Sequence, residues 1–240
     1  MDTRRLQRTG GSSITITLPK KWIEQNELND KDILKLSSPT SHVLLLEPIG
    51  RKKMLSKSIL NADGITDTWL TRDIVAHYIA GIDEITIQSK RISPEQRSNI
   101  RNLSNFLTGF ELIDETAEKI VLRNIFDPSK FPITKNIEKM FLTTISMFQD
   151  ALKAIIENDK LLAKDVVGRD FEVDKLLLII ARQRNSLEQN KISKEELGMN
   201  LSDLHYYEDV ATQVERIADH AVKIARVVEG LNKKFGTIHI

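Results

Sequence analysis

The spacing of apolar residues changes along the chain, and this change limits the possible folds most. Near the N-terminus, Ile14, Ile16 and Leu18 alternate with threonines, which is typical of a half-buried β-strand. From residue 134 onward, apolar residues recur three and four positions apart, which is typical of amphipathic helices. A chain of 240 residues can also bury more than one hydrophobic core. The sequence therefore predicts an α+β multidomain protein.

The first domain, residues 1–50, is expected to be small and rich in β-strands. The expected strands are 4–8, 14–18, 33–36 and 43–46, with a loop at 38–41 between the last two. Gly10-Gly11 can turn the chain between the first two strands, and Pro19 suits the first position of a short helix that ends near Asn26. So few elements enclose too small a core to be stable alone. We therefore expect this domain to form a dimer.

Basic residues are concentrated in this domain. Residues 1–53 contain ten Lys and Arg against six Asp and Glu, a net charge of +4, whereas residues 54–240 carry −3. A polyanion such as DNA is therefore expected to bind at the N-terminal end. The candidate DNA-binding residues are Arg4, Arg5, Arg8, Lys20 and Lys21. The arginines suit phosphates and guanine edges, whereas the lysines suit phosphates.

The run Ser13–Lys21, with the arginines and Gly10-Gly11 before it, resembles the AbrB-type swapped-hairpin domain over residues 3–48. The resemblance implies an intertwined homodimer that binds DNA through basic residues near its N-terminus. Antitoxin-like relatives of this family also bind proteins. A dimerisation domain with an incidental basic face is therefore the alternative.

Residues 54–130 alternate helix and strand patterns and predict a small α/β segment, which resembles a ferredoxin-like layer. A helix over 68–80 is expected to end at Gly81, and Ser93 with Gln96 forms a capping box at the start of the next helix. Strands are expected at 84–87, 110–114 and 119–122, and a linker at 127–132. The segment has no phosphate loop, no nucleophile elbow and no pair of histidines at metal-binding spacing, so no enzyme activity is predicted.

Residues 134–234 predict an antiparallel three-helix bundle. The first long helix is expected to end near Asn158, and the last spans residues 201–231. Ser193 and Glu196 form a second capping box on a short turn between the last two long helices. The apolar stripe of the first helix comprises Met140, Phe141, Ile145, Phe148, Leu152, Ile155 and Ile156.

Two carboxylate pairs lie on these helices. Asp170 and Asp174 are four residues apart on the second helix, and Glu215 and Asp219 have the same spacing on the third, so each pair shares a helix face. Like charges at this spacing repel unless a cation or a basic group lies between them. Carboxylates from neighbouring helices suit divalent ions such as Mg, Mn or Fe(II). Acidic pairs on solvated helix faces are also common, so the spacing alone leaves a metal site open.

The run Glu215–Ala221 and the acidic pair of the second helix resemble the two acidic signatures of the PhoU family of phosphate-uptake regulators, over residues 136–232. The resemblance implies that the four carboxylates are ligands of iron, zinc or another metal ion. PhoU proteins typically carry two three-helix repeats, whereas this chain has one. A second subunit would then supply the other repeat. The fused arrangement resembles archaeal PhoU-like regulators that begin with an AbrB-type domain.

The sequence therefore predicts a cytoplasmic, homodimeric, DNA-binding regulator of phosphate homeostasis. Its bundle would sense phosphate status directly, through a metal ion, or through a phosphate transporter or sensor protein. The chain has no cysteine and no apolar segment long enough to span a membrane, and a signal peptide is not expected. One alternative is an interaction protein that docks a transporter or sensor kinase without binding DNA. Another is a carboxylate-bridged metalloenzyme, which the absence of the usual Glu-x-x-His ligand pairs disfavours.

Overall fold

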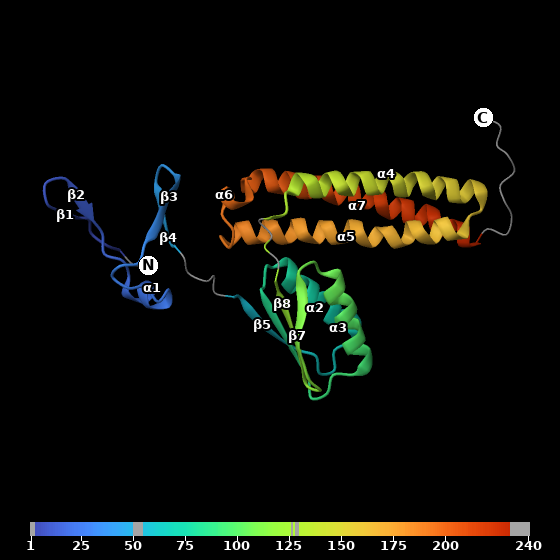
Figure 1. Ribbon diagram of the computed structural model, residues 1–240, viewed down its shortest axis with the longest axis horizontal. Helices are drawn as coiled ribbons and strands as arrows, with labels where there is room; N and C mark the ends of the chain where they lie inside the picture. The colour runs from blue at the N-terminus through green and yellow to red at the C-terminus, as the bar shows by residue number, and fades with distance from the viewer. Residues whose placement is uncertain (1–2, 50–54, 126, 128–129, 231–240) are drawn as a thin grey trace. The chain divides into compact units, whose positions relative to one another are not determined.

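The protein is described by a computed structural model for residues 3–49, 55–125, 127 and 130–230 (Figure 1). The chain divides into two compact units, Met1–Met54 and Leu55–Ile240. The first contains strand hairpins, and the second contains the α/β segment and the helical bundle. This layout confirms the predicted α+β multidomain fold.

The N-terminal unit consists of two antiparallel hairpins separated by a short helix. Its elements are β1 (Gln7–Thr9), β2 (Ser13–Thr15), α1 (Lys20–Gln25), β3 (Leu34–Thr40) and β4 (Val43–Pro48). Gly10 turns the chain between β1 and β2 with a φ of 69°, a left-handed conformation that favours glycine. Pro19 is the N-cap of α1 rather than its first residue. The loop expected at 38–41 is shorter, because β3 continues to Thr40 across an irregularity in its pairing.

Few apolar residues of this unit are buried. Leu28 is the only buried hydrophobic residue among its described residues. Ile14 and Ile16, which the alternating pattern predicts to be half-buried, are 62% and 50% exposed. A single copy therefore leaves the apolar face of this strand uncovered.

The α/β segment is a four-stranded sheet with two helices. Its elements are β5 (Lys57–Asn61), α2 (Asp67–Ile79), β6 (Glu84–Gln88), α3 (Pro94–Phe106), β7 (Phe110–Glu115) and β8 (Lys119–Asn124). The strand order is β5-β6-β8-β7, in which only β5 and β6 are parallel. The sheet buries Ile85, Ile87, Ile120 and Leu122 in one core with α2 and α3. The capping box of Ser93 and Gln96 starts α3 as predicted.

The α/β character of this segment is confirmed, but its topology is not ferredoxin-like. The observed order is β-α-β-α-β-β, whereas a ferredoxin-like layer has the order β-α-β-β-α-β. The strand that the sequence pattern did not predict is β5, an edge strand that pairs with β6 alone. Alternate residues of β5 are exposed, including Ile59 at 67%, so β5 lacks the apolar pattern of a buried strand.

The bundle consists of three long antiparallel helices, as predicted. Its elements are α4 (Ile133–Glu157), α5 (Lys160–Glu188), α6 (Lys194–Leu197) and α7 (Leu201–Gly230) (Figure 1). Asn158, with a φ of 56°, ends α4, and the Asp159 side chain accepts hydrogen bonds from the first backbone amides of α5. Many of the core residues are alanines, which let the helices approach closely: Ala151, Ala154, Ala163, Ala211, Ala218, Ala221 and Ala225.

Helix α5 joins the bundle to the α/β segment by capping the C-terminal end of α2. The last carbonyl groups of a helix have no partner within it and carry partial negative charge. Side chains of α5 and the turn after it donate to the carbonyls of Tyr78 and Ile79, which end α2, and to those of Ala80 and Gly81, which follow it. The donors are Arg182, Asn185, Gln189 and Lys191, respectively. The two parts of this unit are therefore connected by an ordered polar junction.

Candidate functional site

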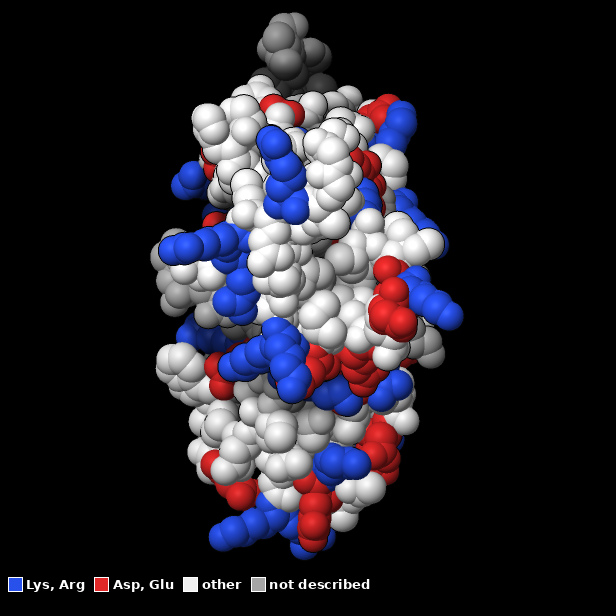
Figure 2. All heavy atoms as spheres, turned by 90° about the vertical axis from the view of Figure 1, so that its left-hand side faces the viewer, with Lys and Arg blue, Asp and Glu red and all other residues white. Residues whose placement is uncertain are grey.

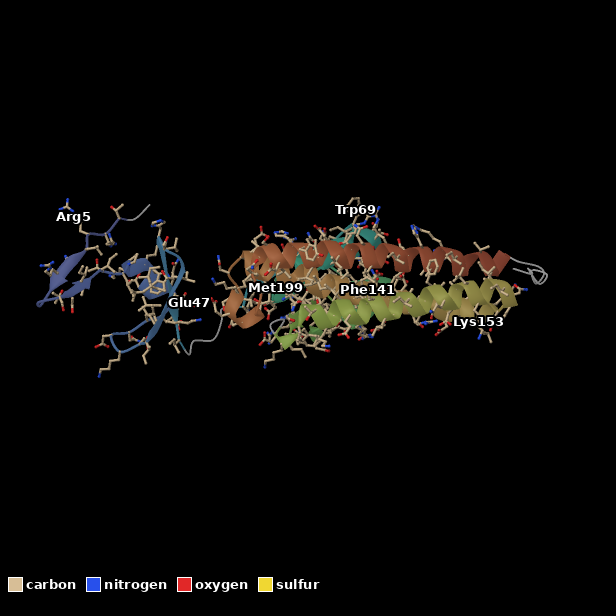
Figure 3. All side chains as sticks on the ribbon, turned by 90° about the horizontal axis from the view of Figure 1, so that it is seen from above. Arg5, Glu47, Trp69, Phe141, Lys153 and Met199 are labelled. Carbon is tan, nitrogen blue, oxygen red and sulfur yellow. The ribbon has the colours of Figure 1, made fainter. Side chains whose placement is uncertain are left out.

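The five predicted DNA-binding residues all lie in the N-terminal unit, and all five are exposed. Arg4 and Arg5 precede β1, Arg8 lies within it, and Lys20 and Lys21 form the first turn of α1. Arg5 projects outward from the strands (Figure 3). The fold therefore brings the basic residues of two sequence segments into one small unit, as a nucleic-acid surface requires.

Two ion pairs of this unit join exposed side chains. Lys20 lies 3.6 Å from Glu24, and Lys35 lies 3.6 Å from Glu47, but these side chains are 38% to 90% exposed. Such exposed ion pairs contribute little to the stability of the fold. In Figure 2, Lys and Arg side chains project at several separate places, with Asp and Glu side chains between them.

The two predicted carboxylate pairs lie close enough to influence one another. Asp170 and Asp174 lie on α5, and Glu215 and Asp219 lie on α7; we call these four residues the acidic cluster. Burial, followed by the charges of the other three members, raises the pKa of Asp174 to about 6. Burial and the charge of Asp219 also raise the pKa of Asp170, against the opposing charge of Arg226. The fold therefore gathers negative charge that favours protonation or a bound cation.

The donor set of the acidic cluster fits a hard cation. Carboxylate oxygens are the preferred ligands of such ions, and buried Oδ1 of Asp170 has no hydrogen-bond partner among the described residues. Glu215 also has a raised pKa, caused first by burial and then by Asp219 and Asp170. Within the described parts of the chain, however, no three His, Cys, Asp or Glu side chains are already arranged to hold a metal ion.

The raised pKa of Asp174 predicts a specific pH dependence of stability. An ordinary Asp has a pKa of 3.8, and a folded-state pKa of about 6 means that the folded chain binds the proton more tightly. Proton binding by Asp174 therefore adds to the free energy of unfolding. This stabilisation is complete below about pH 4 and is lost as the pH rises through 6. In a chelator, Asp174→Asn should therefore be more stable than the original chain above pH 6, by roughly 1 kcal/mol after solvent screening. Denaturant titrations at pH 4 and pH 7.5 measure the difference, and an equal offset at both pH values would contradict it.

Helix α4 carries two apolar stripes, and the residues that the sequence pattern grouped into one stripe divide between them. The buried stripe of α4 includes Met140, Met147, Ala151 and Ala154, whereas the other stripe faces outward. The outward stripe comprises Phe141, Ile145, Phe148, Leu152 and Ile156, which are 36% to 65% exposed. Its first part lines an apolar groove of about 260 Å³ with Val214 and Ile217 of α7. The width of the apolar arc on α4 was the signal that could have revealed this groove.

Comparisons with known families agree with both ends of the chain. Residues 137–228 match the model of the PhoU domain, and residues 7–53 match the model of the antidote-toxin recognition MazE, bacterial antitoxin. The expected combination of a PhoU-like bundle with an AbrB-type N-terminal domain is thereby confirmed. Both are regulatory rather than catalytic families. No curated protein and no solved structure matches the chain. Over its described residues, the protein contains no helix that is long and apolar enough to cross a membrane.

Proposed function

We propose that this chain is a cytoplasmic, DNA-binding regulator of phosphate uptake. The observation that carries the proposal is the joining of a MazE-like segment with exposed arginines to a PhoU-like bundle in one chain. The N-terminal unit binds DNA, and phosphate contacts made by its arginines supply most of the affinity. The bundle reports phosphate status, through a metal ion or through a transport or sensor protein. Genome-wide recovery of the DNA bound at high and at low phosphate tests this function.

The near absence of a core in the N-terminal unit supports dimerisation. Burial of apolar side chains is the main favourable term in folding, and Leu28 is the one buried hydrophobic residue among the described residues of this unit. The exposed apolar residues of β2 and the segment after it would be covered by the same strands of a second copy. A two-fold dimer would also present two sets of arginines to the DNA.

A substitution in this apolar face should separate the two subunits. The double variant Ile14→Asp, Ile16→Asp places charges where the second copy is expected to pack, so the full-length chain should lose its dimer in sedimentation experiments. The matched control is Thr15→Asp, Thr17→Asp, which adds the same charge to the opposite face and should remain dimeric. Equal behaviour of the two variants would contradict this dimer surface.

The bundle offers a second surface for self-association. The PhoU resemblance implies a second three-helix repeat, and the outward stripe of α4 is the apolar face that such a repeat would cover. Isolated apolar residues are normal on protein surfaces, but a continuous stripe on one helix typically marks an interaction site. We propose that a second copy of the bundle packs here.

The acidic cluster is the proposed cation site. Asp170, Asp174, Glu215 and Asp219 would supply oxygen ligands, and a bound divalent ion would neutralise charges that otherwise repel. Helix α5 carries two of these residues and also carries Arg182 at the junction with α2. A cation that draws α5 and α7 together would therefore act on the helix that holds the α/β segment. This gives the proposed route from the bundle toward the rest of the chain.

Metal binding should depend on both pairs of the acidic cluster. The variant Glu215→Gln, Asp219→Asn removes the α7 ligands while conserving their shape, so most of the bound metal should be lost. The control Glu172→Gln, Asp209→Asn removes the same charge outside the cluster and should retain it. Elemental analysis of protein purified without chelator or affinity-tag metal compares them. If the original chain, the variant and the control contained equal amounts of metal, the ion would bind elsewhere. If none of the three contained metal, the proposed cation site would be contradicted.

The alternative function is an interaction protein without DNA binding. The observation that favours it is the MazE match, because the matched model describes a domain for toxin recognition. In that case the N-terminal unit would recognise a protein, and the bundle would dock a phosphate transporter or sensor kinase. The absence of a DNA mobility shift at low salt would favour this alternative.

A further inference from the structure

Three arginines line one surface cavity of the α/β segment, and the proposed function does not use them. Arg91 lies in the loop before α3, and Arg97 and Arg101 lie one turn apart on α3. The cavity has a volume of about 570 Å³, within the range of small-molecule sites. It shares no residue with the N-terminal unit or with the acidic cluster.

One carboxylate holds two of these arginines in place. Arg101 donates to both oxygens of Glu115, with its Nη2 at 2.9 and 3.0 Å, and Arg97 donates to Glu115 Oε1 as well. Arg97 also donates through Nη2 to the carbonyl oxygen of Thr116 at 3.0 Å. These hydrogen bonds, first from Arg97 and then from Arg101, lower the pKa of Glu115, so it stays ionised. The two guanidinium groups are therefore preoriented by a fixed charge.

The cavity nevertheless keeps an excess of positive charge. A single carboxylate serves Arg97 and Arg101, and the Arg91 side chain makes no ion pair with any described residue. Glu95 and Glu118, the nearest carboxylates in the sequence, are not among the residues that line the cavity. Like charges held together in this way favour the binding of an anion.

The remaining lining of the cavity suits an organic anion. Guanidinium groups bind phosphate groups through paired hydrogen bonds and do not lose their charge. Ile92, Pro94 and Ala117 add apolar surface beside the arginines. The backbone amides at the start of α3 are not the anion site, because Ser93 already caps them. Arginines beside an apolar wall match a molecule with a phosphate group and a flat organic part.

We propose that this cavity binds a small phosphate-bearing molecule of the nucleotide class. Its role as the effector of the regulator rests on the proposed function, whereas the binding itself does not. A route to the bundle exists, because Phe106 of α3 packs against Phe171 of α5 with ring centroids 4.6 Å apart. Phe171 directly follows Asp170 of the acidic cluster. A ligand in the cavity would therefore act, through α3 and this ring contact, on the helix that carries Asp170 and Asp174.

Calorimetric titration of the full-length chain tests the site, with AMP, inorganic phosphate and adenosine as separate probes in chelator. AMP should bind with one site per chain, and adenosine should not bind. Arg91→Gln should weaken AMP binding at least tenfold without disturbing the fold, because this side chain has no ion pair to lose. Arg101→Gln should weaken it as well. Arg72→Gln, which changes an arginine stacked on Trp69 outside the cavity, should leave it unchanged.

Each outcome decides the proposal. Inorganic phosphate that binds as tightly as AMP, and no longer binds in Arg91→Gln, would overturn the nucleotide class and leave a site for the free ion. No binding of AMP or phosphate overturns the proposal, as does binding that Arg91→Gln and Arg101→Gln leave unchanged. A failure of the proposed DNA function is distinguishable, because AMP binding is measured without DNA and does not involve the arginines near β1.

Discussion

Replacing Arg182 with alanine is expected to lower the free energy of unfolding of the 55–240 unit by about 3–5 kcal/mol, the usual cost of removing one partner of a buried charged contact. The Arg182 side chain is only 2% exposed. It donates to the carbonyl oxygen of Tyr78 and lies 3.6 Å from Asp83. Its guanidinium group also lies 4.9 Å from the Tyr78 ring and 5.4 Å from the Phe110 ring. Alanine would remove this charged hydrogen bond and leave a cavity between the rings.

Chemical denaturation followed by circular dichroism measures this change. Arg182→Met should cost less than Arg182→Ala, because methionine fills the space while removing the charge. Lys164→Ala is the matched control, since it removes an exposed cation from the same helix and should change stability by less than about 0.5 kcal/mol. A similar small change in Arg182→Ala would show that the junction between α5 and α2 does not hold the unit together.

Replacing Arg4, Arg5 and Arg8 with alanine is expected to weaken DNA binding by about a hundredfold or more at low salt. Each charge-assisted hydrogen bond to a phosphate contributes on the order of 1.5–3 kcal/mol, and three are removed from each subunit. The slope of log K against log salt should also fall by about 0.9 for every phosphate that the variant no longer binds, or up to about 5 for the six arginines of a dimer. The fold should be unaffected, because all three side chains are exposed.

Fluorescence anisotropy at several salt concentrations tests this effect on the full-length chain. The control variant carries Lys153→Ala, Lys160→Ala and Lys164→Ala, which removes the same charge from exposed positions on the bundle. If the two triple variants were weakened equally, net charge rather than the predicted surface would determine binding. Unchanged affinity in the arginine variant would place the DNA surface elsewhere.

Local signals explain most of the elements that the sequence predicts correctly. The capping boxes at Ser93 and Ser193 start α3 and α6, and the acidic side chain of Asp159 starts α5. Helix periodicity over several turns also identifies the three long helices of the bundle. These signals act within a few residues, so they do not require knowledge of the tertiary structure.

The errors arise where tertiary contacts decide the outcome. Strand β5 has no clear sequence signal, because an edge strand needs only one neighbour and can expose alternate residues. The two stripes of α4 are both apolar, so periodicity could not tell which one faces the core. Arg182 has the sequence pattern of a solvated helix residue, and only the position of α2 explains its burial.

The candidate sites also differ in how much of each the sequence predicts. Spacing alone placed each carboxylate pair on one helix face, and the fold then brought the α5 and α7 pairs within each other's electrostatic influence. Their role as metal ligands stays a prediction. The arginine cavity was not predicted from the sequence. Helix spacing places Arg97 and Arg101 on one face of α3, but Glu115 and Ala117 join them only through the packing of α3 beside the turn after β7.

The most direct test of the central claim is to recover the DNA that the full-length chain binds in cells grown at high and at low phosphate, and to sequence it. A phosphate-responsive regulator should be enriched near phosphate-transport genes, the enrichment should differ between the two conditions, and the Arg4, Arg5 and Arg8 variant should not show it. DNA recovered without sequence preference, or with the same distribution at both phosphate levels, would contradict the claim.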